Sequence, residues 1–161
     1  MPRNLLFQFV LIATAVDAAS AQETTAANEQ LADGKKNYMT VCVACHQATG
    51  LGLPSVFPSL VKSAYVNGSP ERFAAIVLKG NTDEMVIDGK TYNGAMPGQE
   101  AVLSDGKIAS IMTFVRASFG NSSAPVAASV VTGIRAKFVQ RKTPWTQPEL
   151  DAWGEDNTTS K

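Results

Sequence analysis

Two cysteines and the only histidine of this 161-residue chain stand together in one pentapeptide, Cys42-Val43-Ala44-Cys45-His46. Residues three apart on a helical turn share a face, so Cys42 and Cys45 reach the same edge of a flat ligand. The Cys-x-x-Cys-His spacing predicts covalent attachment of one haem, with one thioether from each thiol. His46 then supplies an imidazole ligand to the iron.

Two other kinds of site use closely spaced cysteines. A Cys-x-x-Cys redox disulfide is expected within a βαβ pattern, and no such pattern flanks residues 42–46. A structural zinc site needs four Cys or His ligands, whereas the whole sequence holds two Cys and one His. A chance match inside a structural helix is the remaining alternative to haem attachment.

With one histidine in the chain, the second axial position of the iron is held by a methionine, by a non-standard group or by nothing, and methionine is the candidate of suitable chemistry. Met96 precedes Pro97, which disfavours helix and holds Met96 extended, so that its thioether points in a fixed direction. Met85 also lies in a predicted loop and is the competing candidate. Met39 and Met112 lie within helical patterns, and we expect both to pack in the core.

The balance of charge limits the classes of partner. Formal net charge is zero, with 14 basic and 14 acidic residues, whereas a nucleic-acid-binding protein usually has a basic excess. Nucleic acid is therefore not an expected partner, and charges that steer a protein partner must be local. The 45% of hydrophobic residues are typical of a globular chain, and the length suits one domain with additional segments.

The N-terminus has the pattern of an export signal. Arg3 gives a positive start, residues 5–16 are mostly apolar, and Ala19-Ser20-Ala21 fits the small-residue cleavage rule. The apolar run of about 12 residues, or about 18 Å of helix, is too short for a hydrocarbon core of about 30 Å. We therefore expect residues 1–21 to be removed after about Ala21; a retained anchor is the alternative.

A helix is predicted directly before the pentapeptide. Residues 22–28 are polar and predict a flexible lead-in. From Glu29 to Val41, apolar residues recur at helical spacing. Gly34 lies inside this helix, where glycine costs about 0.5–1 kcal/mol relative to alanine. We expect close contact with a second helix to require it.

Two further helices are predicted over residues 69–80 and 104–120, each beginning at a serine N-cap and ending at a glycine. Residues 47–68 and 81–100 have no sustained periodicity and are predicted as loops. Loops of this length are unusual in a small domain, and they are expected where they wrap a cofactor. Asp88-Gly89 predicts a tight turn between two short strands.

Residues 121–161 extend past this helical unit. Residues 121–128 are predicted as a linker, and Ser129 as the N-cap of an amphipathic helix. Residues 146–149 form a capping-box pattern for a short last helix. Two interpretations stay open: a helix packed on the core with a solvated basic face, and a docking segment for a redox partner. The apolar stripe comprises Val130, Val131, Ile134 and Phe138, and the basic face Arg135, Lys137, Arg141 and Lys142.

Residues 30–120 resemble the class I c-type cytochromes, through the pentapeptide, the Met96-Pro97 loop and the flanking helices. The resemblance implies an all-α cytochrome c fold, with helices and loops of residues 29–120 around one covalent haem c. Residues 121–161 are then an extra helical extension. In the family an N-terminal helix with a glycine and an aromatic residue crosses a C-terminal helix. The matching residues here are Gly34 and Tyr38 on the first helix, and Ile111 and Phe114 on the second.

The resemblance also implies the iron ligands. His46 matches the proximal histidine, and Met96 matches the family's methionine on a loop before the last helix. Pro58 matches the proline whose carbonyl accepts a hydrogen bond from the proximal imidazole, which fixes the ring. Many relatives have acidic residues where this chain has Gly106-Lys107. This difference weakens the start of the helix but does not affect the haem site.

Five other side chains were considered for a role at the haem. Three of them have two interpretations, and two are expected only to pack. Arg72 either binds a haem propionate or stays solvated in the first turn of its helix. Tyr65 and Tyr92 either donate to propionates or pack in the core. Trp145 and Trp153 are expected to pack.

The function that the resemblance implies is one-electron transfer in the bacterial periplasm, where covalent haem attachment takes place in this family. Residues 65–97 resemble small cytochromes of respiratory chains or periplasmic dehydrogenases. Expected partners are therefore a periplasmic dehydrogenase, a respiratory complex or a terminal oxidase, with the membrane reached only through them. No catalytic constellation indicates an enzyme. Two alternatives stay open: an electron-transfer subunit of a dehydrogenase or oxidase complex, and a ligand-binding haem sensor or enzyme.

Overall fold

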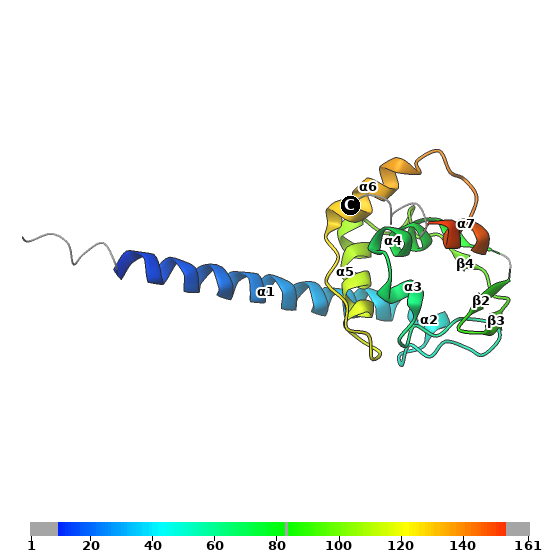
Figure 1. The fold of residues 1–161 in the computed structure, drawn as a ribbon, viewed down its shortest axis with the longest axis horizontal. Coiled ribbons are helices and arrows are strands. Elements are labelled where there is room, and N and C mark those ends of the chain that lie inside the picture. The colour runs from blue at the N-terminus through cyan, green and yellow to red at the C-terminus, as the bar shows by residue number, and fades with distance from the viewer. Residues whose placement is uncertain (1–9, 83, 154–161) are drawn as a thin grey trace, which may run out of the picture.

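The computed structural model describes residues 10–82 and 84–153. This part of the chain is mainly helical, with two small two-stranded sheets (Figure 1). The predicted helical architecture is therefore confirmed. The elements are α1 (Val10–Val41), α2 (Val43–His46), α3 (Ala64–Asn67), α4 (Pro70–Lys79), β1 (Gly80–Asn81), β2 (Met85–Ile87), β3 (Lys90–Tyr92), β4 (Met96–Pro97), α5 (Asp105–Arg116), α6 (Ala128–Lys137) and α7 (Gln147–Ala152).

The packing of α1 on α5 forms the frame of the molecule (Figure 1). A Cβ atom on Gly34 would stand 2.0 Å from the Ser110 carbonyl oxygen, so the predicted close helix contact is confirmed. The rings of Tyr38 and Phe114 meet with their centroids 5.4 Å apart. Ile111, the other α5 residue expected at this crossing, is buried and lines a central cavity.

The first part of α1 extends away from the body of the molecule (Figure 1). Residues 22–28, expected as a flexible lead-in, are helical here, because adding residues to an existing helix avoids the cost of nucleation. The expected cleavage after residue 21 falls within α1, and residues 1–9 of the expected signal lie outside the described residues. Within the described ranges, no helix combines the length and apolarity needed to cross a membrane.

Short strands connect α4 to the site. The Ser69 hydroxyl accepts a hydrogen bond from the Arg72 amide, and Gly80 ends α4 at a positive φ of 75°, as the sequence predicts. β1 then pairs antiparallel with β4, and β2 pairs with β3. The turn between β2 and β3 is Asp88-Gly89, with φ positive at both residues. The predicted tight turn is confirmed.

The tail folds back onto α4 and α5 through α6 (Figure 1). Val131 and Ile134 of the predicted apolar stripe are buried. The predicted start was wrong: Ala127, not Ser129, occupies the N-cap. The reason is the preceding residue, since buried Val126 donates its amide to the Thr113 hydroxyl at 2.9 Å and fixes the chain there.

The start of α7 agrees with its sequence pattern. The Glu149 carboxylate accepts hydrogen bonds from both the amide and the hydroxyl of Thr146, at 2.9 and 3.0 Å. This arrangement is the capping box predicted for residues 146–149.

Candidate haem site

An apolar cavity lies at the centre of the described chain. Its walls come from α1, α2, α4 and α5 and from the loops between them. Among the described lining residues none is Lys, Arg, Asp or Glu. Because protein interiors are otherwise close-packed, such a cavity suits a flat, largely apolar ligand. Its chemically distinctive lining residues are Cys42, Cys45, His46, Met85 and Met96.

The pentapeptide forms a single helical turn at one wall of this cavity. Cys42 is the N-cap of α2, and its carbonyl oxygen accepts the His46 amide at 3.0 Å. Both thiols are free and both line the cavity. Burial, and secondarily the neighbouring Cys45, raise the pKa of Cys42 to about 11. The two sulfurs are thus available together for attachment of one ligand.

His46 is 9% exposed, and its Nδ1 lies 3.1 Å from the Pro58 carbonyl oxygen. The contact expected from the family resemblance is present. Burial lowers the pKa of His46, and the Pro58 contact partly offsets this, so the ring is held in the neutral form that binds metals. With Nδ1–H donating to Pro58, the lone pair of Nε2 is left for another partner.

Gly52 lies in the loop that follows His46 and supports it, and the sequence did not single this glycine out. Its φ is +66°, and a Cβ atom there would stand 2.3 Å from the Phe57 carbonyl oxygen and 2.6 Å from that of Pro58. The Gly52 amide donates to the His46 carbonyl oxygen at 3.1 Å. Glycine therefore lets the loop fold closely enough to bring Pro58 to His46. Gly50 and Gly52 in a loop directly after the pentapeptide were the available signal.

Met96 lines the cavity from β4. Its extended backbone, predicted from Pro97, pairs with Asn81 of β1. A Cβ atom on Gly80 would stand 2.1 Å from the Met96 carbonyl oxygen. The strand that carries Met96 is therefore held by a very close backbone contact.

The other methionines divide into two groups. Met85, on β2, is 5% exposed and lines the same cavity, so two thioethers share this space. Met112 is fully buried, as predicted. Met39 was predicted in the core, but it is 45% exposed. The neighbouring Tyr38 points inward, and successive helical residues are rotated by about 100°.

The candidate propionate partners are already engaged. The Arg72 guanidinium stacks on the Tyr65 ring, 4.5 Å from its centroid, and donates to the Ala64 carbonyl oxygen. Arg72 does not line the cavity, and its buried Nε has no partner in the described structure. Tyr65 lines the cavity, but its hydroxyl donates to the Asp151 carboxylate at 2.6 Å. Tyr92 is buried in the β2–β3 hairpin.

Sequence reasoning also missed how the tail reaches the site. Trp145, predicted only to pack, is 4% exposed and bonds to both Gly80 and Thr82 through its backbone. The Gln147 side-chain amide pairs with the Val86 backbone in both directions, at 2.7 and 2.8 Å. These contacts join segments about 60 residues apart, so no local spacing indicates them.

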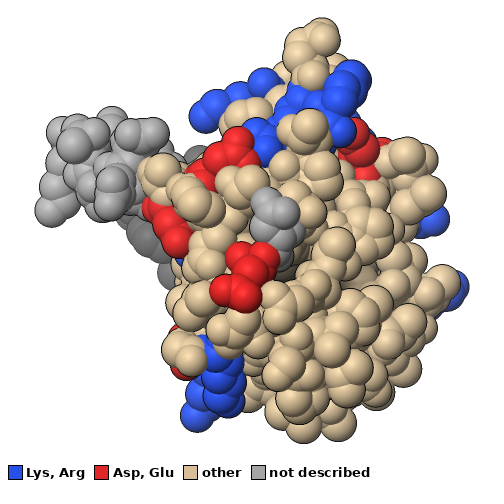
Figure 2. Space-filling view, turned by 90° about the vertical axis from the view of Figure 1, so that its right-hand side faces the viewer, with Lys and Arg blue, Asp and Glu red and all other residues tan. Residues whose placement is uncertain are grey.

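The surface beside the hairpin is mostly uncharged. Figure 2 shows the side of the molecule that carries β2 and β3, with basic side chains gathered along one edge. Several large apolar side chains of the described chain are exposed, among them Leu51 and Leu53 in the loop after the pentapeptide and Val86 in β2. Charge on this side is therefore local, as the zero net charge suggested.

The residues at the cavity fit a covalent haem c. Two free thiols, a neutral imidazole and a soft thioether face one apolar cavity, and these are the donor types of c-type haem attachment. The fit rests on residue types and their common cavity.

Comparison with known proteins gives the family. The protein-family model described as cytochrome c oxidase, cbb3-type, subunit III matches residues 29–115. Cytochrome c-552 of Thermus thermophilus is 31% identical over 115 residues, which cover 66% of this chain and 86% of that protein.

Cytochrome subunits of dehydrogenases are also among the relatives. That of fructose dehydrogenase from Gluconobacter japonicus is 32% identical over 127 residues, 73% of this chain and 25% of the relative. That of quinone alcohol dehydrogenase from Gluconacetobacter polyoxogenes is 28% identical over 124 residues, 74% of this chain and 26% of the relative. The chain thus spans about a quarter of each subunit. Together with the cavity, these matches show that the chain belongs to the class I c-type cytochromes, which are electron-transfer proteins.

Proposed function

We propose that this protein is a periplasmic carrier of single electrons on one haem c. Cys42 and Cys45 hold the haem covalently, and His46 and Met96 bind its iron. The observation that carries the proposal is the shared cavity, which both thiols, the imidazole and the thioether line. When bound, the haem supplies reversible one-electron chemistry between Fe(III) and Fe(II).

His46 has the role of a preoriented ligand in this proposal. Donation from Nδ1 to the Pro58 carbonyl oxygen fixes the tautomer and the ring angle, and makes Nε2 a better donor. Burial keeps the imidazole neutral. The proximal side therefore needs little rearrangement when the charge of the iron changes.

Met96 is favoured over Met85 as the second ligand. The Met96 backbone is fixed by β1 on one side and by Pro97 after it, whereas Met85 is packed among core residues. A methionine thioether is a soft ligand that favours Fe(II) and raises the reduction potential. The uncharged lining of the cavity acts in the same direction, because it disfavours the more positive oxidised state.

Reduction potentials of two matched variants test the ligand assignment. We expect Met96→Ala to lower the midpoint potential of the haem-loaded protein strongly, and Met85→Ala to leave it near the wild-type value. The wild type should titrate as a single one-electron couple. A strong drop in Met85→Ala with no change in Met96→Ala would reverse the assignment.

Mass spectrometry of the protein isolated from the periplasm tests attachment and export. We expect a chain that begins at Gln22 and carries the mass of one haem. Cys42→Ala and Cys45→Ala should each remove one thioether bond. A haem that organic solvent extracts from the wild type would contradict covalent attachment, and an intact residue 1 would contradict cleavage.

A second candidate function is that of an electron-transfer subunit within a larger oxidoreductase. The dehydrogenase cytochrome subunits among the relatives favour it. If the tail were its interface, an exposed apolar tail face would be expected, but Val131 and Ile134 of the stripe are buried. Purification under mild conditions separates the two functions: a free carrier elutes alone, and a subunit elutes with its partner.

A further inference from the structure

We propose that the C-terminal tail, residues 121–153, positions the Met96 strand, and that Trp145 is its central positioning residue. This inference rests on the proposed function, because it takes Met96 as the iron ligand. It assigns the tail a role inside the protein, in place of the docking role considered for it from the sequence.

The backbone of Trp145 extends the small sheet that carries Met96. The Trp145 amide donates to the Gly80 carbonyl oxygen at 3.0 Å, and the Thr82 amide donates to the Trp145 carbonyl oxygen at 2.9 Å. Asn81 thus pairs with Met96 on one side and with Trp145 on the other. The strand β1 lies directly between the tail and the proposed ligand.

The side chain of Trp145 is fixed from several directions. Its Nε1–H donates to the Ala75 carbonyl oxygen of α4 at 2.9 Å. The Phe138 and Trp153 rings pack against it, with centroids 5.0 and 5.4 Å away. The Arg141 guanidinium lies 3.7 Å from its ring centroid. Trp145 therefore cannot shift without disturbing both α4 and the tail.

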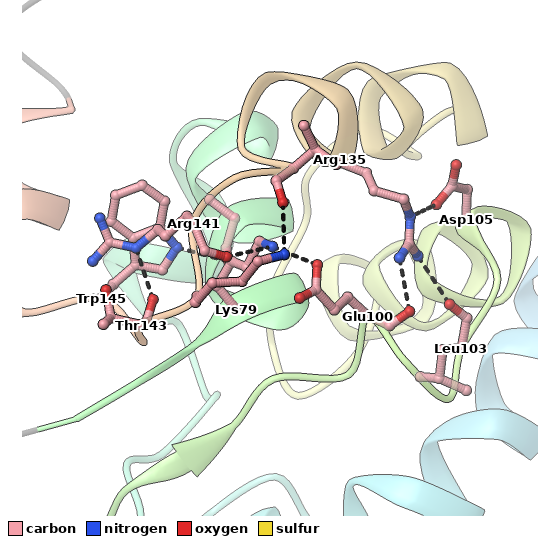
Figure 3. A network of polar contacts seen from close by, with 11 residues as sticks. Lys79, Glu100, Leu103, Asp105, Arg135, Arg141, Thr143 and Trp145 are labelled. Carbon is pink, nitrogen blue, oxygen red and sulfur yellow. Dashed lines mark hydrogen bonds and ion pairs between the residues drawn. The ribbon is translucent and has the colours of Figure 1, made fainter.

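The tail also holds the chain that follows Met96 (Figure 3). Arg135 donates to the carbonyl oxygens of Glu100 and Leu103 at 2.7 and 2.9 Å. Buried Lys79 bridges the Glu100 carboxylate, at 2.5 Å, and the Arg141 carbonyl oxygen, at 2.9 Å. Segments before and after the Met96 strand are thus fastened to the same tail.

Gln147 provides an internal contrast. Its side-chain amide bonds to the backbone of Val86 on β2, the strand that carries Met85. One tail residue thus serves the strand next to Met96, and another serves the strand of Met85. Substitutions at Trp145 and Gln147 should therefore affect different methionines.

The test compares three variants of the full haem-loaded protein, Trp145→Phe, Gln147→Ala and Trp153→Phe, with Met96→Ala as the reference that lacks the proposed ligand. Trp145→Phe keeps an aromatic ring at this position and removes the Nε1–H that donates to the Ala75 carbonyl oxygen, so one buried hydrogen bond is lost. Trp153→Phe is the control, because this ring contacts the same cluster. The readouts are the rate of carbon monoxide binding to the reduced protein and the denaturation midpoint.

We expect carbon monoxide to bind Trp145→Phe at least about tenfold faster than the upper limit that the unchanged wild-type spectrum sets, as loss of one buried hydrogen bond allows. The rates of carbon monoxide binding to Gln147→Ala and Trp153→Phe should stay within about twofold of the wild-type limit. The rate in Trp145→Phe should exceed that of Trp153→Phe even where their denaturation midpoints agree. A general loss of stability would not produce that difference.

Three results would overturn the inference in distinguishable ways. If Trp145→Phe matches Trp153→Phe while Met96→Ala binds carbon monoxide at once, the positioning role fails and the proposed function stands. If only Gln147→Ala binds faster, Met85 is the ligand, and both the inference and the Met96 assignment fail. If the wild type itself binds promptly, the proposed function fails first.

Discussion

The two sides of the cavity are held in different ways. On the side of His46, the pentapeptide, Gly52 and Pro58 lie within a short stretch and bond mainly to one another. On the side of Met96, the strand β4 depends on β1, which in turn depends on Trp145 in the tail. The proposed proximal ligand is thus positioned locally, and the proposed distal ligand by contacts between distant segments.

This difference has a consequence for stability. Local contacts require little loop closure, whereas distant ones must offset the closure of long loops. The segments with few internal contacts are generally those that open first. We therefore expect the Met96 side to loosen before the His46 side, and the following substitutions separate the two.

The largest effect is expected at Gly80, on the distal side. Gly80→Ala places a Cβ atom 2.1 Å from the Met96 carbonyl oxygen at a φ of +75°, so both overlap and backbone strain oppose it. We expect about 3 kcal/mol less stability in urea denaturation, and faster carbon monoxide binding. Gly89→Ala is the control, since it has a similar φ of +71° with nothing within 4 Å. Equal losses of stability in Gly80→Ala and Gly89→Ala would show that backbone strain alone is responsible, and that the close contact with Met96 contributes nothing.

Gly34 tests the helical frame. Gly34→Ala brings a Cβ atom to 2.0 Å from the Ser110 carbonyl oxygen and should cost about 2 kcal/mol through forced separation of α1 and α5. The same change at Gly133, where a Cβ atom meets nothing within 4 Å, should stabilise α6 by about 0.5–1 kcal/mol. Denaturation midpoints measure both. A stabilised Gly34→Ala would contradict the close crossing.

Arg135 tests the attachment of the tail to the chain after Met96. Arg135→Met removes the ion pair with Asp105, at 2.7 Å, and two bonds to backbone carbonyls. We expect a loss of about 1–2 kcal/mol and a change in carbon monoxide binding. Lys137→Met, which among the described residues loses only the contacts with the Phe138 and Trp153 rings, should have the smaller effect on both stability and carbon monoxide binding. A larger effect in Lys137→Met than in Arg135→Met would show that Arg135 does not support the Met96 side of the cavity.

The smallest effect is expected from pH. Arg141, and then the Thr146 amide, lower the pKa of Glu149 from 4.5 to about 2. The contribution of Glu149 to stability is therefore present above pH 4.5 and is lost as pH falls toward 2. Because the side chain is 41% exposed, we expect no more than about 1 kcal/mol. The stability difference between wild type and Glu149→Gln should shrink across this window; a constant difference would contradict the linkage.

The difference between local and distant contacts also decides which features can be predicted from the sequence. Cys42, Cys45 and His46 are recognised by spacing alone, and local signals also gave the ends of α4, the Asp88-Gly89 turn and the cap of α7. Each of these features depends on neighbours within a few residues. The start of α6 was misplaced because the anchor of Val126 lies on α5.

The role of Trp145 could not be predicted for the same physical reason. Its bonds reach Ala75, Gly80 and Thr82, and backbone pairing between distant segments has no residue-type signature. Met39 shows the limit of helical spacing, because a pattern indicates a helix more reliably than it indicates which face is buried. Local structure was therefore predictable, and the distant contacts that support it were not.

Addition of carbon monoxide to the dithionite-reduced wild-type protein at neutral pH, followed by visible absorbance, tests the central claim most directly. If His46 and Met96 both hold the iron firmly, the spectrum stays unchanged, as an electron carrier requires. Prompt formation of a carbon monoxide complex would contradict the account, since it would show an open or weakly held distal position and favour a ligand-binding haem protein.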